Sequence, residues 1–229
     1  MTPGLLGSEP LVRWDWVRDH LACYGTDCIR TRTWEHVQLT VLAVVIGSLI
    51  SFPLGVYAHR HARVYPPVTF VTGLLYTIPS LALFVMLLPF TGLTFTTAEI
   101  GLVSYTLLIL IRNTVAGLRG VPEDVKEAAR GMGYTERQLL WRVELPLALP
   151  AVMAGVRIAT VTTIGLVTVT ALIGLGGEGH FILKGLNEFF STPTVVGATL
   201  SVVLAVIADV LLLGLQRVLT PWSRRKAAL

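Results

Sequence analysis

Two charged side chains lie inside long apolar stretches of the sequence, where a charged group is rare. Arg157 lies in the stretch Leu147–Val169, and Asp209 lies in the stretch Thr194–Leu219. A charge within a membrane span is costly to insert and usually faces protein or water. At the helical rise per residue, both lie about 15 Å from the same end of two antiparallel spans. These depths predict an ion pair between Arg157 and Asp209. A role for Arg157 in a polar pathway, or separate partners for the two charges, are the alternatives.

Hydroxyl groups are concentrated in the same stretch as Arg157. They belong to Thr160, Thr162, Thr163, Thr168 and the following Thr170. Such side chains form hydrogen bonds between helices in lipid, and they equally suit the lining of a polar, uncharged passage. Both interpretations stay open, with Thr160 and Thr163 as the candidates for a passage.

A glycine-rich segment, Gly174–Gly179, formally satisfies the dinucleotide-binding pattern Gly-x-Gly-x-x-Gly. That fingerprint requires a strand before it and a helix after it, whereas this segment follows an apolar stretch. We therefore exclude nucleotide binding. We predict a flexible or tightly turned loop with Glu178 and His180 exposed, followed by a short helix over Phe181–Phe190. The sequence also lacks a Gly-x4-Gly-Lys-Ser/Thr loop, so it has no phosphate cradle for using ATP.

Side chains suited to metal binding or redox chemistry are sparse. Cys23 and Cys28 are separated by four residues, and they would form a disulfide in an oxidising compartment or stay as free thiols. We expect no metal site with them, since no further cysteine lies nearby to complete one. His59 and His61 lie among arginines, where solvation at a membrane interface explains them better than a metal.

The chain that positions these side chains is too apolar to fold as a water-soluble domain. Of its 229 residues, 53% are apolar and 14% are charged, and the mean hydropathy is +0.70. A soluble domain carries about a quarter of its residues as charges. The high apolar content and low charge exclude a disordered chain. Two cysteines are too few for a disulfide scaffold. Since a span needs about 20 apolar residues, we predict spans at Val37–Ala58, Pro67–Leu88, Ala98–Ile111 with an extension to Leu118, Leu147–Val169 and Thr194–Leu219.

Lysine and arginine near the span ends indicate the orientation, because cytoplasmic loops carry an excess of them. They gather between the first and second spans, between the third and fourth, and after the fifth. The predicted topology therefore has the N-terminus outside and the C-terminus in the cytoplasm. Four arginines in the N-terminal tail conflict with it, although acidic residues leave the net charge of that tail slightly negative.

Three regions follow from this topology. They are an extracytoplasmic tail at residues 1–34, a five-helix domain at 35–220 with a cytoplasmic loop at 119–146, and a basic cytoplasmic tail at 221–229. No removable signal peptide is evident. In the first region, Leu11–Cys23 has the spacing of an amphipathic helix, which would lie at the membrane interface or pack on the extramembrane loops.

The cytoplasmic loop carries the start and stop signals of a short helix. Pro122 suits its first position, and Glu123 and Asp124 then lie in the first turn, where the helix dipole favours negative charge. Gly131 and Gly133 end it, because glycine adopts backbone angles that disfavour other residues.

A second short helix is predicted in the same loop. Thr135 with Gln138 has the pattern of a capping box, and Leu145-Pro146 ends the helix before the next span. A small helix pair of this kind suits docking into a groove of another protein. A compact interfacial loop without a partner is the alternative.

The loop also contains Glu127-Ala128-Ala129, Gly133, Val143 and Leu145-Pro146 at fixed gaps. This pattern resembles the EAA loop of binding-protein-dependent ABC importer permeases, with Val143 where isoleucine is usual. In that family the loop is the coupling helix, which inserts into an ATPase subunit and transmits its closure to the membrane domain. The resemblance implies a polar contact from Glu127 to the ATPase, a turn permitted by Gly133, and an apolar knob formed by Ala128, Ala129 and Met132.

Four other segments are Ile78–Ala82, Arg112–Thr114, Met153–Arg157 and Ala171–Gly174. They resemble one branch of the same family, the osmoprotectant permeases for glycine betaine, carnitine, choline or proline. The resemblance covers about Val37–Leu219. It implies an all-α, polytopic protein of the bacterial inner membrane, with five transmembrane helices and a MetI-like ABC importer permease fold.

The resemblance also implies a function and partners. The chain would be the permease subunit of an ATP-driven osmoprotectant importer, not an enzyme, and without a cofactor of its own, since ATP and Mg²⁺ bind the partner ATPase. Its partners would be a pair of ATP-binding subunits, an extracellular or periplasmic substrate-binding protein, a second copy or sister permease, and the lipid bilayer, with no nucleic acid. The alternatives are a permease for another small amino-acid-like solute, an ion-coupled secondary transporter and a membrane-embedded enzyme.

Overall fold

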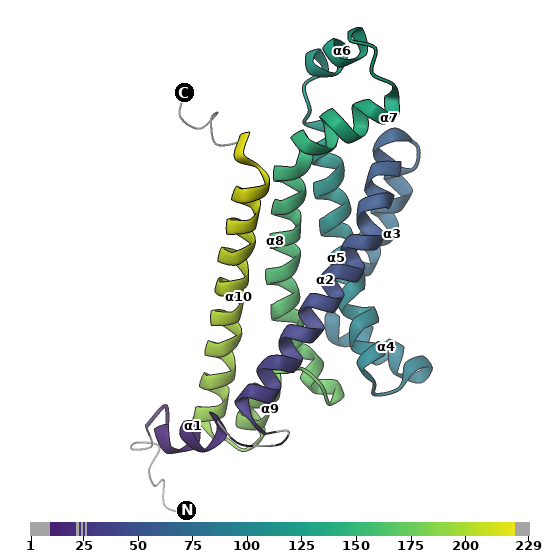
Figure 1. The fold of residues 1–229 in the computed structure, drawn as a ribbon. Helices are drawn as coiled ribbons and strands as arrows, with labels where there is room; N and C mark the ends of the chain where they lie inside the picture. Colours follow the sequence, from purple (N-terminus) through teal and green to yellow (C-terminus); the bar gives the residue numbers. More distant parts are fainter. Residues whose placement is uncertain (1–9, 22, 24, 26, 223–229) are drawn as a thin grey trace, which may run out of the picture.

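The computed structural model describes residues 10–222 except 22, 24 and 26, and every regular element in this part of the chain is a helix (Figure 1). The helices long and apolar enough to cross a membrane are α2 (Ile29–Arg60), α5 (Phe95–Arg119), α10 (Ser191–Leu219) and the continuous stretch Glu136–Ile173, which contains α8 (Leu145–Val169). The shorter elements are α1 (Trp14–Leu21), α3 (Tyr65–Thr77), α4 (Ser80–Thr91), α6 (Glu123–Gly131), α7 (Glu136–Leu139), the π-helical turn η1 (Leu140–Glu144), the 3-10 turn η2 (Thr170–Ile173) and α9 (Gly179–Asn187).

The span predicted at Pro67–Leu88 corresponds to two helices, α3 and α4, which form a broken crossing bent by 96°. Proline disfavours the helical conformation of the residue before it, and Ile78, which precedes Pro79, is extended (φ −65°, ψ 128°). The Tyr105 hydroxyl of α5 donates a hydrogen bond to the Ile78 carbonyl. The backbone group freed by the break therefore has a partner away from water.

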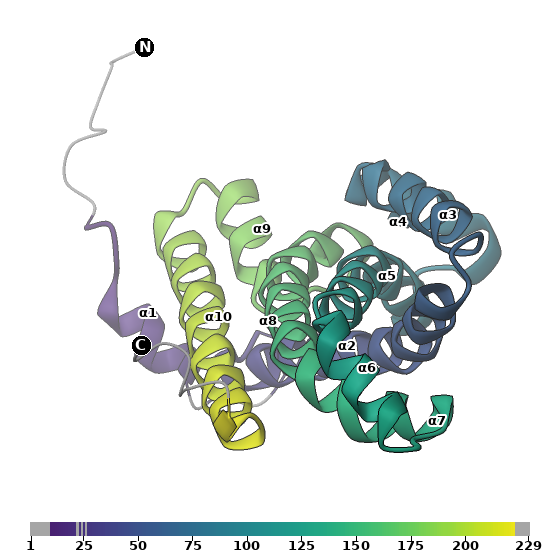
Figure 2. The ribbon, with the colours of Figure 1, turned by 90° about the horizontal axis from the view of Figure 1, so that it is seen from above.

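The chain crosses between two ends of the bundle. α6 and α7 lie at one end and α1 and α9 at the other, so α1 and the last turn of α10 are at opposite ends (Figure 1). Seen along the bundle, α10, α8 and α5 follow one another across the molecule, and α3 and α4 lie beyond α5 (Figure 2). Four long helices with the bent pair as a fifth crossing agree with the predicted five-helix, all-α fold.

α5 forms the centre of the bundle, packed between α2 and α8. A buried cluster joins the helices near the α9 end and consists of Leu39, Ala43, Phe84, Ala98, Leu102, Val167 and Ile173. Small residues bring the helix backbones close together, as is common in lipid. At Gly47 of α2, an added Cβ would clash with the Thr106 hydroxyl of α5, so glycine sets the distance between these two helices.

α1 confirms the helix predicted within Leu11–Cys23, and it packs on other helices. The Trp16 ring lies edge-on to Phe181 of α9 (5.8 Å between centroids) and to Phe190 (6.3 Å). The Arg13 guanidinium lies 5.6 Å from the centre of the Phe190 ring. Trp16 thus packs on neighbouring segments, whereas Trp14 and Leu21 are 68% and 56% exposed, so both interpretations of this helix stay open. Residues 1–9, and the predicted basic tail from residue 223, lie outside the described residues.

Candidate functional site

The sequence around α6 specifies a short helix with defined ends. Pro122 is its N-cap (φ −58°, ψ 139°), one residue earlier than predicted, and Glu123 and Asp124 occupy the first turn. The helix ends at Gly131, and Gly133 has a φ of +85°, a left-handed conformation that a side chain disfavours. The predicted helix, its acidic first turn and its glycine stop are confirmed.

α6 projects beyond the spanning helices at its end of the bundle (Figure 1). Part of its exposed surface, called here the α6 face, consists of Val125, Glu127, Ala128 and Met132, of which Met132 is 70% exposed. Ala129 is only 2% exposed, because it faces the rest of the loop. The surface knob predicted from Ala128, Ala129 and Met132 is therefore corrected to exclude Ala129. The α6 face offers apolar contacts with one carboxylate among them.

α7 begins as predicted, with a complete capping box. The Gln138 amide donates to the Thr135 hydroxyl (3.3 Å), and the Thr135 amide donates to the Gln138 side-chain oxygen (2.9 Å). The predicted stop at Leu145-Pro146 is wrong, since η1 joins α7 to α8 without a break. Pro146 directly follows the π-helical turn, and such local adjustments satisfy the backbone groups that a proline frees in a spanning helix. α7, η1 and α8 therefore form one continuous helical stretch.

Arg157 of α8 and Asp209 of α10 form the ion pair that their depths predict. Arg157 Nε and Nη2 each donate to one carboxylate oxygen at 2.8 Å, which is the bidentate geometry that arginine favours. The side chains are 25% and 35% exposed. They line a groove of about 450 Å³ together with Ala154, Ile158, Val161 and Thr162. The pair holds α8 against α10 and is open to the side of the bundle.

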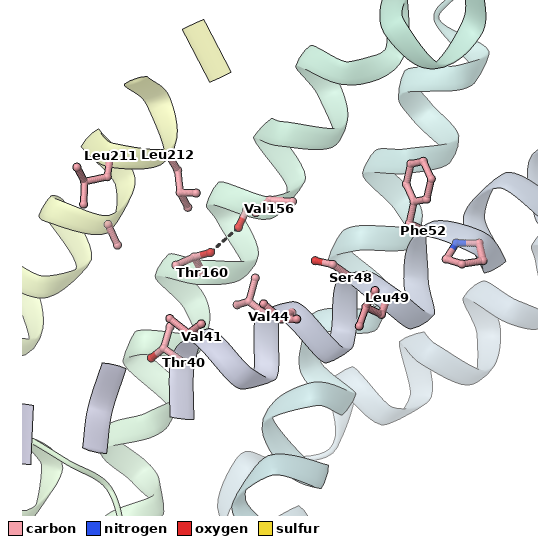
Figure 3. A pocket seen from close by; sticks show the side chains of 13 residues that line it. Thr40, Val41, Val44, Ser48, Leu49, Phe52, Val156, Thr160, Leu211 and Leu212 are labelled. Carbon is pink, nitrogen blue, oxygen red and sulfur yellow. Dashed lines mark hydrogen bonds between the residues drawn. The ribbon is translucent and has the colours of Figure 1, made fainter. Parts of the chain in front are cut away.

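A second groove, of about 670 Å³, lies between α2, α8 and α10 and is almost wholly apolar (Figure 3). Thr160 lines it, but the Thr160 hydroxyl donates to the Val156 carbonyl of its own helix (2.8 Å). Thr163 is buried in helix packing. Of the threonines in α8, Thr162 is the one that lines the groove of the ion pair, and the sequence offered no signal that would have selected it.

Glu178 is 1% exposed, so its predicted exposure is wrong. Its Oε1 accepts a hydrogen bond from the Thr33 hydroxyl (3.1 Å), and burial raises the pKa of this carboxyl group. His36 of α2 lies beside it, with Nδ1 3.7 Å from Glu178 Oε2. The loop comes this close because Gly177 has a φ of +49° and a Cβ there would lie 2.5 Å from His36 Cβ. The glycine-rich segment follows helix η2 and serves packing, which agrees with rejecting a nucleotide site.

An ion cluster connects the start of α2 to α9. Asp27 lies 2.8 Å from His180 Nε2 and accepts from Lys184 Nζ at 2.7 Å, and these hydrogen bonds, that of Lys184 first, lower the Asp27 pKa to about 2. His180 is thus only partly exposed. Cys23 and Cys28 are free thiols, with Cys28 Sγ 2.5 Å from the Cys23 carbonyl oxygen. A disulfide between them stays a prediction. Among the described residues, no group of three or more His, Cys, Asp or Glu is placed to hold a metal.

Comparison with known proteins places this geometry among transport proteins. Residues 41–224 match the family described as "Binding-protein-dependent transport system inner membrane component". The chain is 36% identical over 190 residues to the choline transport system permease protein OpuBB of Bacillus subtilis, covering 83% of this chain and 88% of that one. It is 37% identical over 196 residues to the carnitine transport permease protein OpuCB of Listeria monocytogenes (86% and 90% covered). It is 39% identical over 194 residues to the osmoprotectant import permease protein OsmW of Salmonella typhimurium (82% and 90% covered).

Solved structures show the same fold at lower identity. The inward-facing MetNI methionine ABC transporter includes a chain that matches with a TM-score of 0.76 and 24% identity, covering 84% of this chain and 96% of that one. A chain of an amino acid ABC transporter solved with histidines matches with a TM-score of 0.58 and 20% identity, covering 80% and 89%. At these identities the likeness establishes the fold alone.

Proposed function

Since the chain belongs to the family of binding-protein-dependent transport system inner membrane components, we propose that it is the permease subunit of an ATP-driven osmoprotectant importer. The substrates in question are glycine betaine, choline, carnitine or proline. This substrate class is supported by the relatives, which are permeases for choline, for carnitine and for osmoprotectants. The observation that carries the coupling role is the α6 face, an exposed apolar surface on a helix held away from the spans.

In this proposal the α6 face docks into a groove on an ATPase subunit. Glu127 makes the polar contact, and Ala128 and Met132 fill the apolar part of the groove. Ala129 supports α6 from within, and Gly133 permits the turn that holds α6 outward. ATP and Mg²⁺ bind the partner, because the chain has no phosphate-binding loop.

The end of the bundle that carries α6 faces the cytoplasm, and α1 and α9 face outward. This orientation is supported by the basic residues at the α6 end, which cytoplasmic segments favour. They are Arg60, Arg63, Arg119, Lys126, Arg130, Arg137 and Arg142. Fewer basic residues lie at the opposite end, namely Arg13, Arg18, Arg30, Arg32 and Lys184.

A pair of permeases, either two copies or this chain with a sister permease, encloses the passage. The groove of Arg157 and Asp209 faces that passage, because a partly exposed ion pair at this depth is costly against lipid. The second groove is almost wholly apolar and suits contact with acyl chains (Figure 3). Thr162, beside the ion pair, adds a hydroxyl to the passage wall.

Alternating access follows from the preferences of the partners for different states. ATP binding closes the two ATPase subunits, which draw the two coupling helices together and open the passage outward. A substrate-binding protein then releases its substrate, and hydrolysis resets the complex. No aromatic side chain lines the groove of the ion pair, whereas quaternary ammonium groups are held best by aromatic cages. Substrate selection therefore lies mainly with the binding protein.

Purification and reconstitution test this proposal. A tagged chain should co-purify with an ATPase subunit, and the complex in proteoliposomes should import labelled glycine betaine, choline, carnitine or proline only with ATP and the binding protein. Import of a different small amino-acid-like solute would show that the proposed substrate class is wrong but that the chain is still part of an ATP-driven importer. Import driven by an ion gradient without the ATPase would overturn the proposal.

A further inference from the structure

A polar cavity of about 260 Å³ lies at the base of α6, where four helical elements meet. Its lining residues are His59 and Arg60 of α2, Lys126 and Arg130 of α6, Glu136 of α7 and Glu144 of η1. His59, expected to be solvated at the membrane interface, is only 14% exposed. Glu144 and Lys126 are buried. Charged groups from separate elements are thus collected in one place beneath the exposed helix.

Contacts across this cavity run from α6 through α7 to α2. Arg130 Nε donates to the Glu136 side chain at 3.3 Å, and Arg60 Nη2 donates to the Glu136 backbone carbonyl at 2.7 Å. Glu136 is therefore a shared partner of α6 and α2. At the far side of the cavity, His59 Nε2 lies 4.0 Å from Glu144 Oε1, which brings α2 against the turn that leads into α8.

α6 buries little of its own surface, so these contacts matter for its position. Only Lys126 and Ala129 of this helix are buried. Lys126 extends into the cavity, and its Nζ pairs with Glu123 at 3.0 Å. α6 also packs against α7 and η1, and the chain segments on either side of it, one of which turns at Gly133, connect it to the bundle.

We infer that this cavity transmits the displacement of α6 to the spanning helices, with Arg60 and Glu136 as positioning residues. The inference rests on the proposed function, since it requires an ATPase that moves α6. When α6 moves, Arg130 draws Glu136 with it, and Glu136 holds Arg60 at the end of α2. α7 passes the same displacement through η1 into α8. α8 carries Arg157, which lines the groove of the ion pair, and α2 lines the apolar groove. Both grooves therefore change shape when α6 moves.

The test uses the full complex with its ATPase and binding protein in proteoliposomes. Arg60→Gln keeps a long polar side chain but removes the charge from the hydrogen bond to Glu136. We expect it to lower the number of substrate molecules imported per ATP hydrolysed by about two- to fivefold, since the lost hydrogen bond is exposed to solvent. The yield of assembled complex and the substrate-stimulated ATPase rate should stay unchanged. Arg60→Lys, which keeps the charge, should recover part of the ratio.

Arg142→Gln is the matched control, because Arg142 is exposed on η1 and does not line the cavity. An unchanged import ratio in Arg60→Gln would overturn the inference while leaving the proposed function intact. Absence of ATP-driven import by the unaltered chain would instead overturn the proposed function. If Arg60→Gln fails to assemble, Arg130→Gln takes its place, with the same expected loss and the same refuting result.

Discussion

Gly133 sets the turn after α6 with a backbone angle that alanine resists, which gives a quantitative test of the coupling role. Its φ is +85°, and an added Cβ would meet no atom within 4 Å. The penalty of Gly133→Ala is therefore conformational, about 1–2 kcal/mol for a left-handed residue with a side chain. A penalty of this size reduces the population of the native turn about 5–30-fold relative to competing turns.

Gly131 provides a matched control within the same loop. It is the last residue of α6, it is not among the glycines with positive φ, and its added Cβ also meets no atom within 4 Å. Alanine is a better helix former than glycine by about 1 kcal/mol, so Gly131→Ala should leave α6 unchanged or slightly more stable. Both variants add a methyl group, and they differ in the φ angle of the residue that receives it.

The assay measures imported substrate per ATP hydrolysed in proteoliposomes, with amide hydrogen exchange over residues 123–133 as a report on the turn. We expect Gly133→Ala to lower the ratio several-fold and to speed exchange, and Gly131→Ala to do neither. An unaltered ratio in Gly133→Ala together with faster exchange would show that coupling does not use this turn. Equal losses in both variants would refute the conformational argument, because side-chain bulk would then be the cause.

Three other predictions follow from the same geometry. Glu127→Lys should abolish stimulation of the ATPase by substrate-loaded binding protein without reducing membrane insertion, and stimulation equal to that of the unaltered chain would remove Glu127 from the contact. Arg157→Asp and Asp209→Arg should each reduce the yield of folded protein, and the double exchange should restore it, since the bidentate pair joins α8 to α10; equal damage in all three would argue against a structural pair. Mild oxidation should join Cys23 to Cys28 and block both from alkylation, as mass spectrometry would detect, whereas two alkylated thiols after oxidation would exclude the bond.

Local signals in the sequence were sufficient for the ends of α6 and the start of α7. The ends of α6 depend on neighbouring residues only, namely an acidic first turn and the backbone freedom of Gly133, so both were predictable. The capping box of Thr135 and Gln138 is equally local. The inward orientation of Ala129 was not predictable, because it depends on how the loop packs. Apolar residues at helical spacing do not indicate which of them are buried in the loop and which are exposed to a partner.

Features that depend on distant contacts were missed. The bend at Pro79 needs Tyr105 of α5 to accommodate the freed carbonyl of Ile78, and the residues around the proline do not reveal that partner. Glu178 is buried because His36 and Thr33 of α2 lie against its loop. A histidine directly before the first predicted span, His36, was the available signal for a buried polar partner. The Arg157–Asp209 pair was predictable, since the cost of charge in lipid and the equal depths both favour pairing.

We propose above all that this chain converts ATP hydrolysis on a partner into transport through the membrane. The most direct measurement is the uptake of labelled glycine betaine, choline, carnitine or proline by proteoliposomes containing the purified complex, with ATP as the energy source that is varied. We predict uptake that requires ATP, the ATPase subunits and the binding protein together, and that is lost in Glu127→Lys. Uptake that continues without the ATPase under an ion gradient would contradict the account.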